Sequence, residues 1–259
     1  KILAEAEKPL IHVGGGILRS KAVEEVIELA EYLQAPITTS PSSRGALPED
    51  HPLYLIPACP GNGAIVAQIE ADVVLVVGCR LGALDMWGRP PAWGEPRKQK
   101  TIWIDISPEV IGLNRPVDVA IVGDAKTTLK KLLEKIREYT PPREENMYLQ
   151  EYKVIEKAWL ESFEELSKSD SIPIHPLRVI REVREFFPRD AIAIVDGGNT
   201  NVWCFYLHRI YEPGMYLSSA SGDSGHLGTG IPYAIAAKLA YPERQVYCIT
   251  GDGAFGLNI

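Results

Sequence analysis

The stretch QVYCITGDGAF, residues 245–255, runs from an apolar segment into a glycine-rich turn. Gln245–Thr250 is typical of a buried strand, and Gly251-Asp252-Gly253 follows at its carboxyl end, where open α/β sheets place their ligands. An aspartate there can give oxygen to magnesium, and flanking glycines let the backbone approach a phosphate closely. A tight turn with an N-capping aspartate explains the same residues equally well.

Two further motifs precede this one along the chain. The segment DGGNT, residues 196–200, follows the apolar run Ala191–Val195, and its Asn199 and Thr200 could bind phosphate oxygens beside a helix start. The segment SGDSGHLGTGIP, residues 221–232, is a glycine-rich loop that opens a helix of small residues. Either motif alone is most often a plain loop, so their order along the chain is the informative feature.

The rest of the chain alternates apolar runs with amphipathic stretches. In the first part we predict strands at Pro9–Val13, Pro36–Thr39, Val73–Val77, Thr101–Ile106 and Val119–Val122, with helices at Ser20–Leu33, Gly61–Glu70 and Lys126–Glu138. Ser20 is the expected N-cap of its helix. In the last part we predict strands at Ala191–Val195, Met215–Leu217 and Gln245–Thr250, with helices at Pro176–Phe187, Asn201–Arg209 and Leu227–Leu239. This alternation predicts an α/β protein of two domains, each an open, mainly parallel sheet flanked by helices.

Composition excludes several classes of partner. The net charge of −7 argues against nucleic acid and anionic membrane, and no apolar run reaches membrane-spanning length. The four cysteines, Cys59, Cys79, Cys204 and Cys248, are widely spaced without a CxxC pair. We therefore expect free thiols in a reducing, cytoplasmic compartment, and the spacing argues against a zinc site.

The first domain carries weak signals for a nucleotide. Gly14-Gly15-Gly16 follows a strand, but Arg19 stands where the third glycine of GxGxxG would be, so a plain glycine turn is the better explanation. Asp105 ends a strand where a ribose hydroxyl could be held, and a turn aspartate explains it equally well. Arg80 could meet a phosphate or an adenine face.

Taken in order, these motifs resemble the acetolactate synthase superfamily of thiamine-diphosphate enzymes. The resemblance covers the chain from about Pro9 to its end, and it rests on PLIHVGGGI, LPEDHPLY, ADVVLVVGCRLG, WIDISPEVIG and DVAIVGDAK, followed by DGGNT, SGHLGTGIP and GDGAF. It implies a Rossmann-like middle domain at 1–140, a helical linker arm at 141–171, and the first part of a thiamine-diphosphate-binding domain at 172–259, which would be incomplete.

The resemblance also implies roles for single residues. It assigns cofactor diphosphate contacts to Asn199, Thr200, Gly251, Gly253 and Ala254. Asp252 would be a magnesium ligand.

Two residues of the glycine-rich loop would act on the cofactor itself. The Gly225 carbonyl would accept from the pyrimidine amine, and Leu227 would prop the cofactor in a bent conformation. His226 replaces a small residue, and we favour an inert loop histidine over one at the reaction centre.

The implied activity is decarboxylation of a 2-oxo acid and addition of the remaining fragment to an acceptor carbonyl. For an acetolactate synthase, which serves branched-chain amino acid biosynthesis, two pyruvates give acetolactate and carbon dioxide. The family implies a homodimer or homotetramer, and a regulatory subunit is a further candidate partner. The catalytic glutamate and the second metal ligand of the family have no counterpart in this chain, so we expect the chain alone to be inactive.

Two alternatives stay open at this point. Arg80–Leu84 and Trp87–Pro91 depart from the synthase pattern and look more like 2-hydroxyacyl-CoA lyase, oxalyl-CoA decarboxylase and benzaldehyde lyase. The first domain would then bind ADP or nothing, whereas it would bind FAD in a synthase. A non-catalytic nucleotide-binding module is the alternative from another class.

Overall fold

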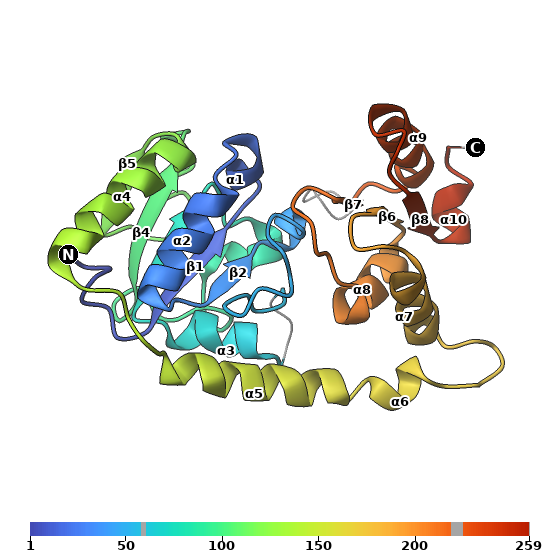
Figure 1. Ribbon diagram of the computed structural model, residues 1–259, viewed down its shortest axis with the longest axis horizontal. Coiled ribbons are helices and arrows are strands. Elements are labelled where there is room, and N and C mark those ends of the chain that lie inside the picture. Colours follow the sequence, from blue (N-terminus) through green and yellow to red (C-terminus); the bar gives the residue numbers. More distant parts are fainter. Residues whose placement is uncertain (58–60, 219–224, 259) are drawn as a thin grey trace. The chain divides into compact units, whose positions relative to one another are not determined.

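The computed structural model describes residues 1–57, 61–218 and 225–258 (Figure 1). The chain divides into two compact units. Unit 1 comprises Lys1–Ala46 and His51–Glu156, and unit 2 comprises Leu47–Asp50 and Lys157–Ile259. The division falls within the stretch expected as a linker arm, and the domain bounds at 140 and 171 stay a prediction.

Unit 1 is built on a five-stranded parallel sheet with the order β2-β1-β3-β4-β5. Its strands are β1 (Pro9–Val13), β2 (Ile37–Thr39), β3 (Val73–Val77), β4 (Lys100–Asp105) and β5 (Val119–Val122). This is the second of the two common doubly wound orders, with its switch point between β1 and β3. The expected open parallel sheet is confirmed. Every residue of β1 and β3 is buried, as in strands that are covered on both faces.

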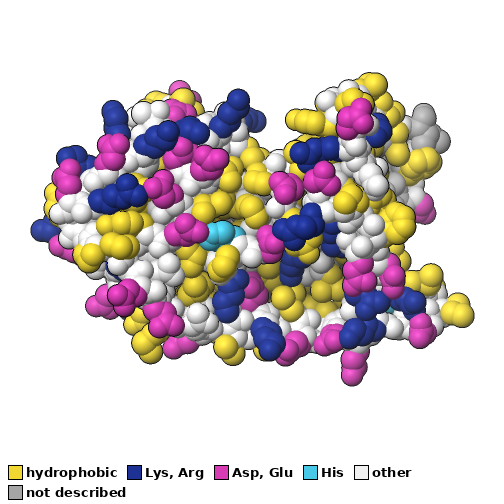
Figure 2. Space-filling model, in the orientation of Figure 1, with side chains coloured by type: hydrophobic (Ala, Val, Ile, Leu, Met, Phe, Trp, Pro, Cys, Tyr) yellow, Lys and Arg dark blue, Asp and Glu magenta, His cyan; other side chains and the backbone are white. Residues whose placement is uncertain are grey.

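The helices of unit 1 are α1 (Gly16–Arg19), α2 (Val23–Leu33), α3 (Gly63–Glu70) and α4 (Ala125–Tyr139), with 3-10 turns η1 (Pro41–Ser43) and η2 (Ala83–Gly88). Helices α2 and α4 contact each other, and Lys126 and Lys130 of α4 pair with Glu25 of α2 (Figure 1). Figure 2 shows cationic and anionic side chains interspersed over this face of unit 1. A mixed surface of this kind attracts polyanions weakly.

The expected N-cap role of Ser20 is wrong. Lys21 has a left-handed φ of 53°, which interrupts the helical path, so that α2 begins at Val23. Ser20 instead donates to Asp124 Oδ2 at 2.6 Å and accepts from Lys126 N at 2.9 Å. It therefore joins the end of α1 to the start of α4, a contact between segments far apart in sequence.

A long helix, α5 (Met147–Glu161), begins in unit 1 and ends in unit 2, and a short helix, α6 (Glu164–Ser167), follows it. The Glu156 carboxylate accepts from Ile56 N at 2.7 Å within unit 1. A Cβ on Gly63 would lie 2.1 Å from Tyr152 O, so only glycine lets α3 start this close to α5. Farther along α5, in the part that belongs to unit 2, the ring of Trp159 stacks on that of Tyr206 with 5.5 Å between the ring centroids.

Unit 2 contains a three-stranded parallel sheet with the order β7-β6-β8. Its elements are β6 (Ile192–Asp196), β7 (Tyr216–Ser218), β8 (Val246–Thr250), α7 (Pro176–Phe186), α8 (Gly198–Leu207), α9 (Gly230–Ala240) and α10 (Asp252–Phe255). Ala193 and Val195 pack into the cluster under α7 and α8, whereas Ile192 and Ile194 pack under α9. This period-two alternation covers both faces of the sheet.

Free thiols and the lack of a membrane-spanning segment were both expected from the sequence. None of Cys79, Cys204 and Cys248 is part of a disulfide, as predicted, and Cys59 lies outside the described residues. No helix within residues 1–57, 61–218 and 225–258 is long and apolar enough to cross a membrane.

Candidate functional site

The carboxyl ends of all three strands of unit 2 lie at one edge of its sheet. Val195 is in register with Ser218, and Asp196 is in register with Thr250. Each strand is followed by one of the three predicted motifs, so the fold brings DGGNT, the glycine-rich loop and GDG to the same edge. Helices α8 and α9 begin there with their positive dipole ends.

The turn after β6 approaches the turn after β8 closely. Gly197 has a φ of +113°, and a Cβ there would lie 3.0 Å from Thr200 Oγ1 and 3.2 Å from Gly251 N. Asn199 is exposed and Thr200 is half-exposed. Both lie in the first turn of α8, which begins three residues earlier than expected. Their side chains are therefore presented from a helix start.

The GDG turn exposes a carboxylate and backbone amides. Asp252 is exposed as the first residue of α10, and the position a Cβ would take on Gly253 has no protein atom within 4 Å. The first backbone bond of α10 is donated by Phe255 N to Gly251 O at 2.8 Å. The Gly251 amide donates to Asp196 O at 3.2 Å. The amides of Asp252, Gly253 and Ala254 are the first donors of the helix, which have no partner within it. Ala254 differs from its neighbours, because its side chain is buried.

The glycine-rich loop is described only from Gly225, and Ser221–Ser224 lie outside the described residues. Gly225 has a φ of +54° with open space around the position of a Cβ, so the turn favours glycine. Leu227 is 45% exposed and His226 is half-exposed. Leu227 lies in the loop, because α9 begins at Gly230 rather than at the expected Leu227.

Asp196 is a buried residue of this edge to which the sequence analysis gave no role. Its Oδ2 accepts from Gly230 N at 2.6 Å, so a side chain at the end of β6 caps the start of α9. Among the described residues, its Oδ1 and Thr229 Oγ1 are buried without a hydrogen-bond partner. Burial and the Asp196 carboxylate raise the pKa of the Cys248 thiol to about 11. An acidic residue that ends an apolar strand was the available signal.

The candidate nucleotide-binding residues of unit 1 follow β1, β3 and β4. A Cβ on Gly14 would lie 2.3 Å from Gly78 O, and one on Gly16 would lie 2.7 Å from Gly78 Cα. The close packing of two turns therefore accounts for these two glycines, while Gly15 is half-exposed.

The other two candidates lie at the same edge of the sheet. The Asp105 carboxylate accepts from Ser107 N at 2.9 Å, the pattern of a turn aspartate. Arg80 is exposed, and its backbone carbonyl accepts from Asn114 Nδ2 at 3.2 Å.

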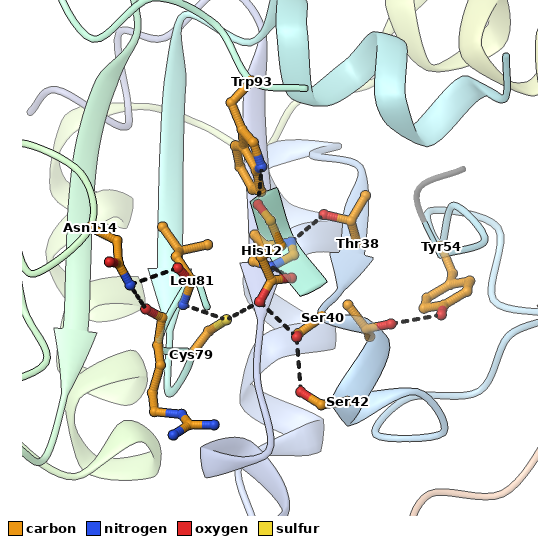
Figure 3. Close-up of polar contacts among 12 residues, drawn as sticks. His12, Thr38, Ser40, Ser42, Tyr54, Cys79, Leu81, Trp93 and Asn114 are labelled. Carbon is orange, nitrogen blue, oxygen red and sulfur yellow. Dashed lines mark hydrogen bonds and ion pairs between the residues drawn. The ribbon is translucent and has the colours of Figure 1, made fainter. Parts of the chain in front are cut away.

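A buried polar cluster beneath this edge was not foreseen (Figure 3). His12 Nδ1 and Thr38 Oγ1 lie 2.9 Å apart, and His12 Nε2 lies 3.3 Å from Asp85 Oδ1. Asp85 Oδ2 accepts from Ser40 Oγ at 2.8 Å and lies 3.7 Å from Cys79 Sγ. Burial, followed by the Asp85 charge, raises the pKa of the Cys79 thiol well above its usual range.

The η2 turn, which carries Asp85, has two strained residues. Met86 and Trp87 have φ values of 49° and 52°, a left-handed conformation that costs about 1–2 kcal/mol per residue outside glycine. Their side chains are 55% and 48% exposed. Trp93 Nε1 donates to Asp85 O at 2.8 Å and helps to hold the turn.

Family models match both units. A model described as the central domain of thiamine pyrophosphate enzymes matches residues 1–132. A second, described as their C-terminal TPP binding domain, matches residues 196–259.

Curated relatives match along the whole chain. The chain is 34% identical over 272 residues to a probable acetolactate synthase large subunit of Methanococcus aeolicus, and 35% identical over 273 residues to one of Methanocaldococcus jannaschii. It is 31% identical over 286 residues to a sulfoacetaldehyde acetyltransferase of Castellaniella defragrans. The alignments cover 100% of this chain but 44%, 43% and 46% of these relatives, so the chain spans less than half their length.

Proposed function

The chain belongs to the thiamine pyrophosphate enzymes, and on that premise we propose that it is part of an acetolactate synthase-like enzyme that needs thiamine diphosphate and magnesium. The observation that carries the proposal is the meeting of three motifs at the carboxyl edge of the unit 2 sheet. Relatives named acetolactate synthase support this substrate class over others.

The residues at this edge fit a diphosphate and its cation. Asp252 offers an exposed carboxylate beside the free amides of a helix start, which suits magnesium bound to phosphate oxygens. Gly198 and Gly253 leave open space where a side chain would otherwise stand. The unpartnered Asp196 Oδ1 and Thr229 Oγ1 are further polar atoms at this edge. In our proposal Asn199, Thr200, Gly251, Gly253 and Ala254 hold the diphosphate, and Asp252 holds the magnesium.

The remaining loop residues would orient the cofactor. Bound thiamine diphosphate supplies the carbon that adds to a 2-oxo acid and takes up the charge left when carbon dioxide departs. The Gly225 carbonyl would accept from the pyrimidine amine, and the exposed Leu227 side chain would provide the apolar support. Both would act by positioning, which lowers the entropic part of the barrier.

A second candidate is an enzyme of the 2-hydroxyacyl-CoA lyase, oxalyl-CoA decarboxylase or benzaldehyde lyase type. The observation in its favour is the η2 turn, where the sequence departs from the synthase pattern and presents Met86 and Trp87 at the surface. The two candidates differ in the nucleotide that Gly15, Arg80 and Asp105 would meet in unit 1. FAD would favour the synthase, and ADP or no nucleotide would favour the second candidate.

The wider setting belongs to the same proposal. We place the enzyme in the cytoplasm, as a homodimer or homotetramer that serves branched-chain amino acid biosynthesis. Several relatives are named large subunits, which supports a smaller regulatory partner.

The test uses the full-length protein. Nucleotide released by denaturation is identified first, and acetolactate formation from pyruvate is then measured with thiamine diphosphate and magnesium. Asp252→Asn is expected to lower activity by about 10–100-fold, because it replaces a charged metal ligand with a neutral amide. Asp170→Asn, at an exposed residue of unit 2, is the matched control and should keep full activity. Unchanged activity in Asp252→Asn, or no acetolactate from the parent enzyme, would reject the proposed function.

A further inference from the structure

Three side chains of metal-ligand type converge inside unit 1. A ring nitrogen of His12, Cys79 Sγ and a carboxylate oxygen of Asp85 all lie within 4.8 Å of one another. The exposed fractions of these residues are 0%, 4% and 8%. His12 lies on β1, Cys79 lies in the turn after β3, and Asp85 lies in η2. We propose that His12, Cys79 and Asp85 bind one divalent ion of the zinc class, at a site separate from that proposed for magnesium at Asp252.

Two of the separations are close in size to those within a tetrahedral zinc centre. Zinc–ligand bonds of about 2.0–2.2 Å to nitrogen and oxygen and about 2.3 Å to sulfur place nitrogen about 3.4 Å from oxygen, and sulfur about 3.6 Å from oxygen. The observed values are 3.3 Å from His12 Nε2 to Asp85 Oδ1 and 3.7 Å from Cys79 Sγ to Asp85 Oδ2. The two distances end on different oxygens of Asp85, and the three ligand atoms lie within 4.8 Å of one another, so an ion would bind once the carboxylate turns and the ligands draw together.

The His12 ring is held as a metal-binding imidazole usually is. Its Nδ1 lies 2.9 Å from Thr38 Oγ1, an outer partner that orients the ring (Figure 3). Its Nε2 is fully buried and forms no hydrogen bond, although Asp85 Oδ1 lies 3.3 Å away. The two atoms are therefore close enough for an ion pair but do not form a hydrogen bond. A cation bound between them would satisfy both atoms.

Charge and ligand chemistry favour a zinc-class ion. A thiolate and a carboxylate carry two negative charges, and a divalent ion with a neutral imidazole brings the buried site to zero. Sulfur and imidazole select zinc or cobalt, whereas magnesium and calcium prefer oxygen alone. Ser40 Oγ donates to Asp85 Oδ2 at 2.8 Å and would orient the carboxylate as an outer partner of the ion.

Such an ion would hold the η2 turn against the sheet, because it would bind Asp85 of the turn and His12 of β1 together. Asp85 directly precedes the strained Met86 and Trp87, while His12 and Cys79 belong to the region of the switch point. A metal bond between them would offset the backbone strain and fix the edge that presents Arg80 and Trp87. The role is structural, and it does not depend on which 2-oxo acid the enzyme uses.

The first experiment needs no variant. Full-length protein, purified without a metal-affinity tag, is equilibrated with Zn²⁺ and dialysed into metal-free buffer. We expect about one zinc ion to be retained per chain, with an X-ray absorption spectrum that shows one sulfur at about 2.3 Å and the remaining scatterers at about 2.0–2.2 Å. No retained zinc, or zinc bound without sulfur, overturns the proposal and leaves the cluster as a hydrogen-bonded ion pair.

Variants then identify the sulfur. Co²⁺ loaded in place of zinc should give a thiolate charge-transfer band in the parent protein. Cys79→Ser should lose this band, and Cys248→Ser, at a half-buried thiol of unit 2, should keep it. A band that survives in Cys79→Ser overturns the assignment. If Cys79→Ser does not fold, the X-ray absorption spectrum of the parent decides the question.

Discussion

Gly230 is the residue at which a single methyl group should disturb the candidate site most directly. It is the first residue of α9, and its amide donates to Asp196 Oδ2 at 2.6 Å. A Cβ on Gly230 would lie 2.9 Å from both Asp196 Cβ and Cys248 Sγ, closer than such atoms can approach. In Gly230→Ala, α9 must therefore move away from β6 and β8.

The expected cost follows from these contacts. Overpacking of this kind costs about 1–3 kcal/mol, and a weakened hydrogen bond to a charged group adds up to about 1.5–3 kcal/mol. The helix propensity of alanine returns about 0.8–1.0 kcal/mol. We expect a net loss of about 2 kcal/mol or more in the free energy of unfolding of unit 2.

A matched control lies on the neighbouring helix. Gly198 is the first residue of α8, and a Cβ there meets no atom within 4 Å. Gly198→Ala should therefore be neutral or slightly stabilising. The assay is the thermal unfolding midpoint of the full-length protein by circular dichroism. Equal midpoints for Gly230→Ala and the parent, or an equal loss in Gly198→Ala, would refute the packing argument.

Three further predictions concern unit 1. Arg115→Met should lower the free energy of unfolding by about 3 kcal/mol or more, because the buried guanidinium donates to Thr101 Oγ1 and to loop carbonyls that would lose their donor. A urea titration in which the variant unfolds at the same concentration as the parent would contradict this. Gly63→Ala should lower the thermal midpoint or prevent folding, since its Cβ would lie 2.1 Å from Tyr152 O, and a soluble variant that melts with the parent would show that α5 can move aside. Hydrogen bonds from Ser20 and Thr127 lower the pKa of Asp124 below its usual 3.8, so the stabilisation of the fold by the ionised Asp124 is complete above that pH and is lost as the pH falls through the folded-state pKa. The difference in thermal midpoint between the parent and Asp124→Asn should therefore shrink in acid. A difference that is constant from neutral pH to strong acid would argue against the linkage.

Element types were readable from the sequence because each is set by local pattern. Val73–Val77 is wholly apolar and became a buried central strand, and the period of α4 matched a helix with one buried stripe. Helix starts were less predictable. Helix α8 begins at Gly198, whereas we expected it to begin at Asn201. The positive φ of Gly197 turns the chain there, so that the helix starts directly after the turn.

The candidate site shows the same limit. Asn199, Gly225 and Asp252 could be named from their motifs, and their roles toward the cofactor stay a prediction. Asp196 ends an apolar strand, but the sequence does not show its role, since its partner Gly230 belongs to another motif and meets it only through the parallel pairing of β6 with its neighbours.

Strands and most helices could be predicted from the sequence, because each depends on residues that are near one another along the chain. The family could be predicted from the order in which such local motifs follow one another. The tertiary structure alone decided which side chains meet. Ser20 contacts Asp124, and His12 lies close to Cys79 and Asp85. Spacing along the chain detects ligands that share one turn. Ligands carried by neighbouring strands are brought together by sheet register and crossover, which no local pattern records.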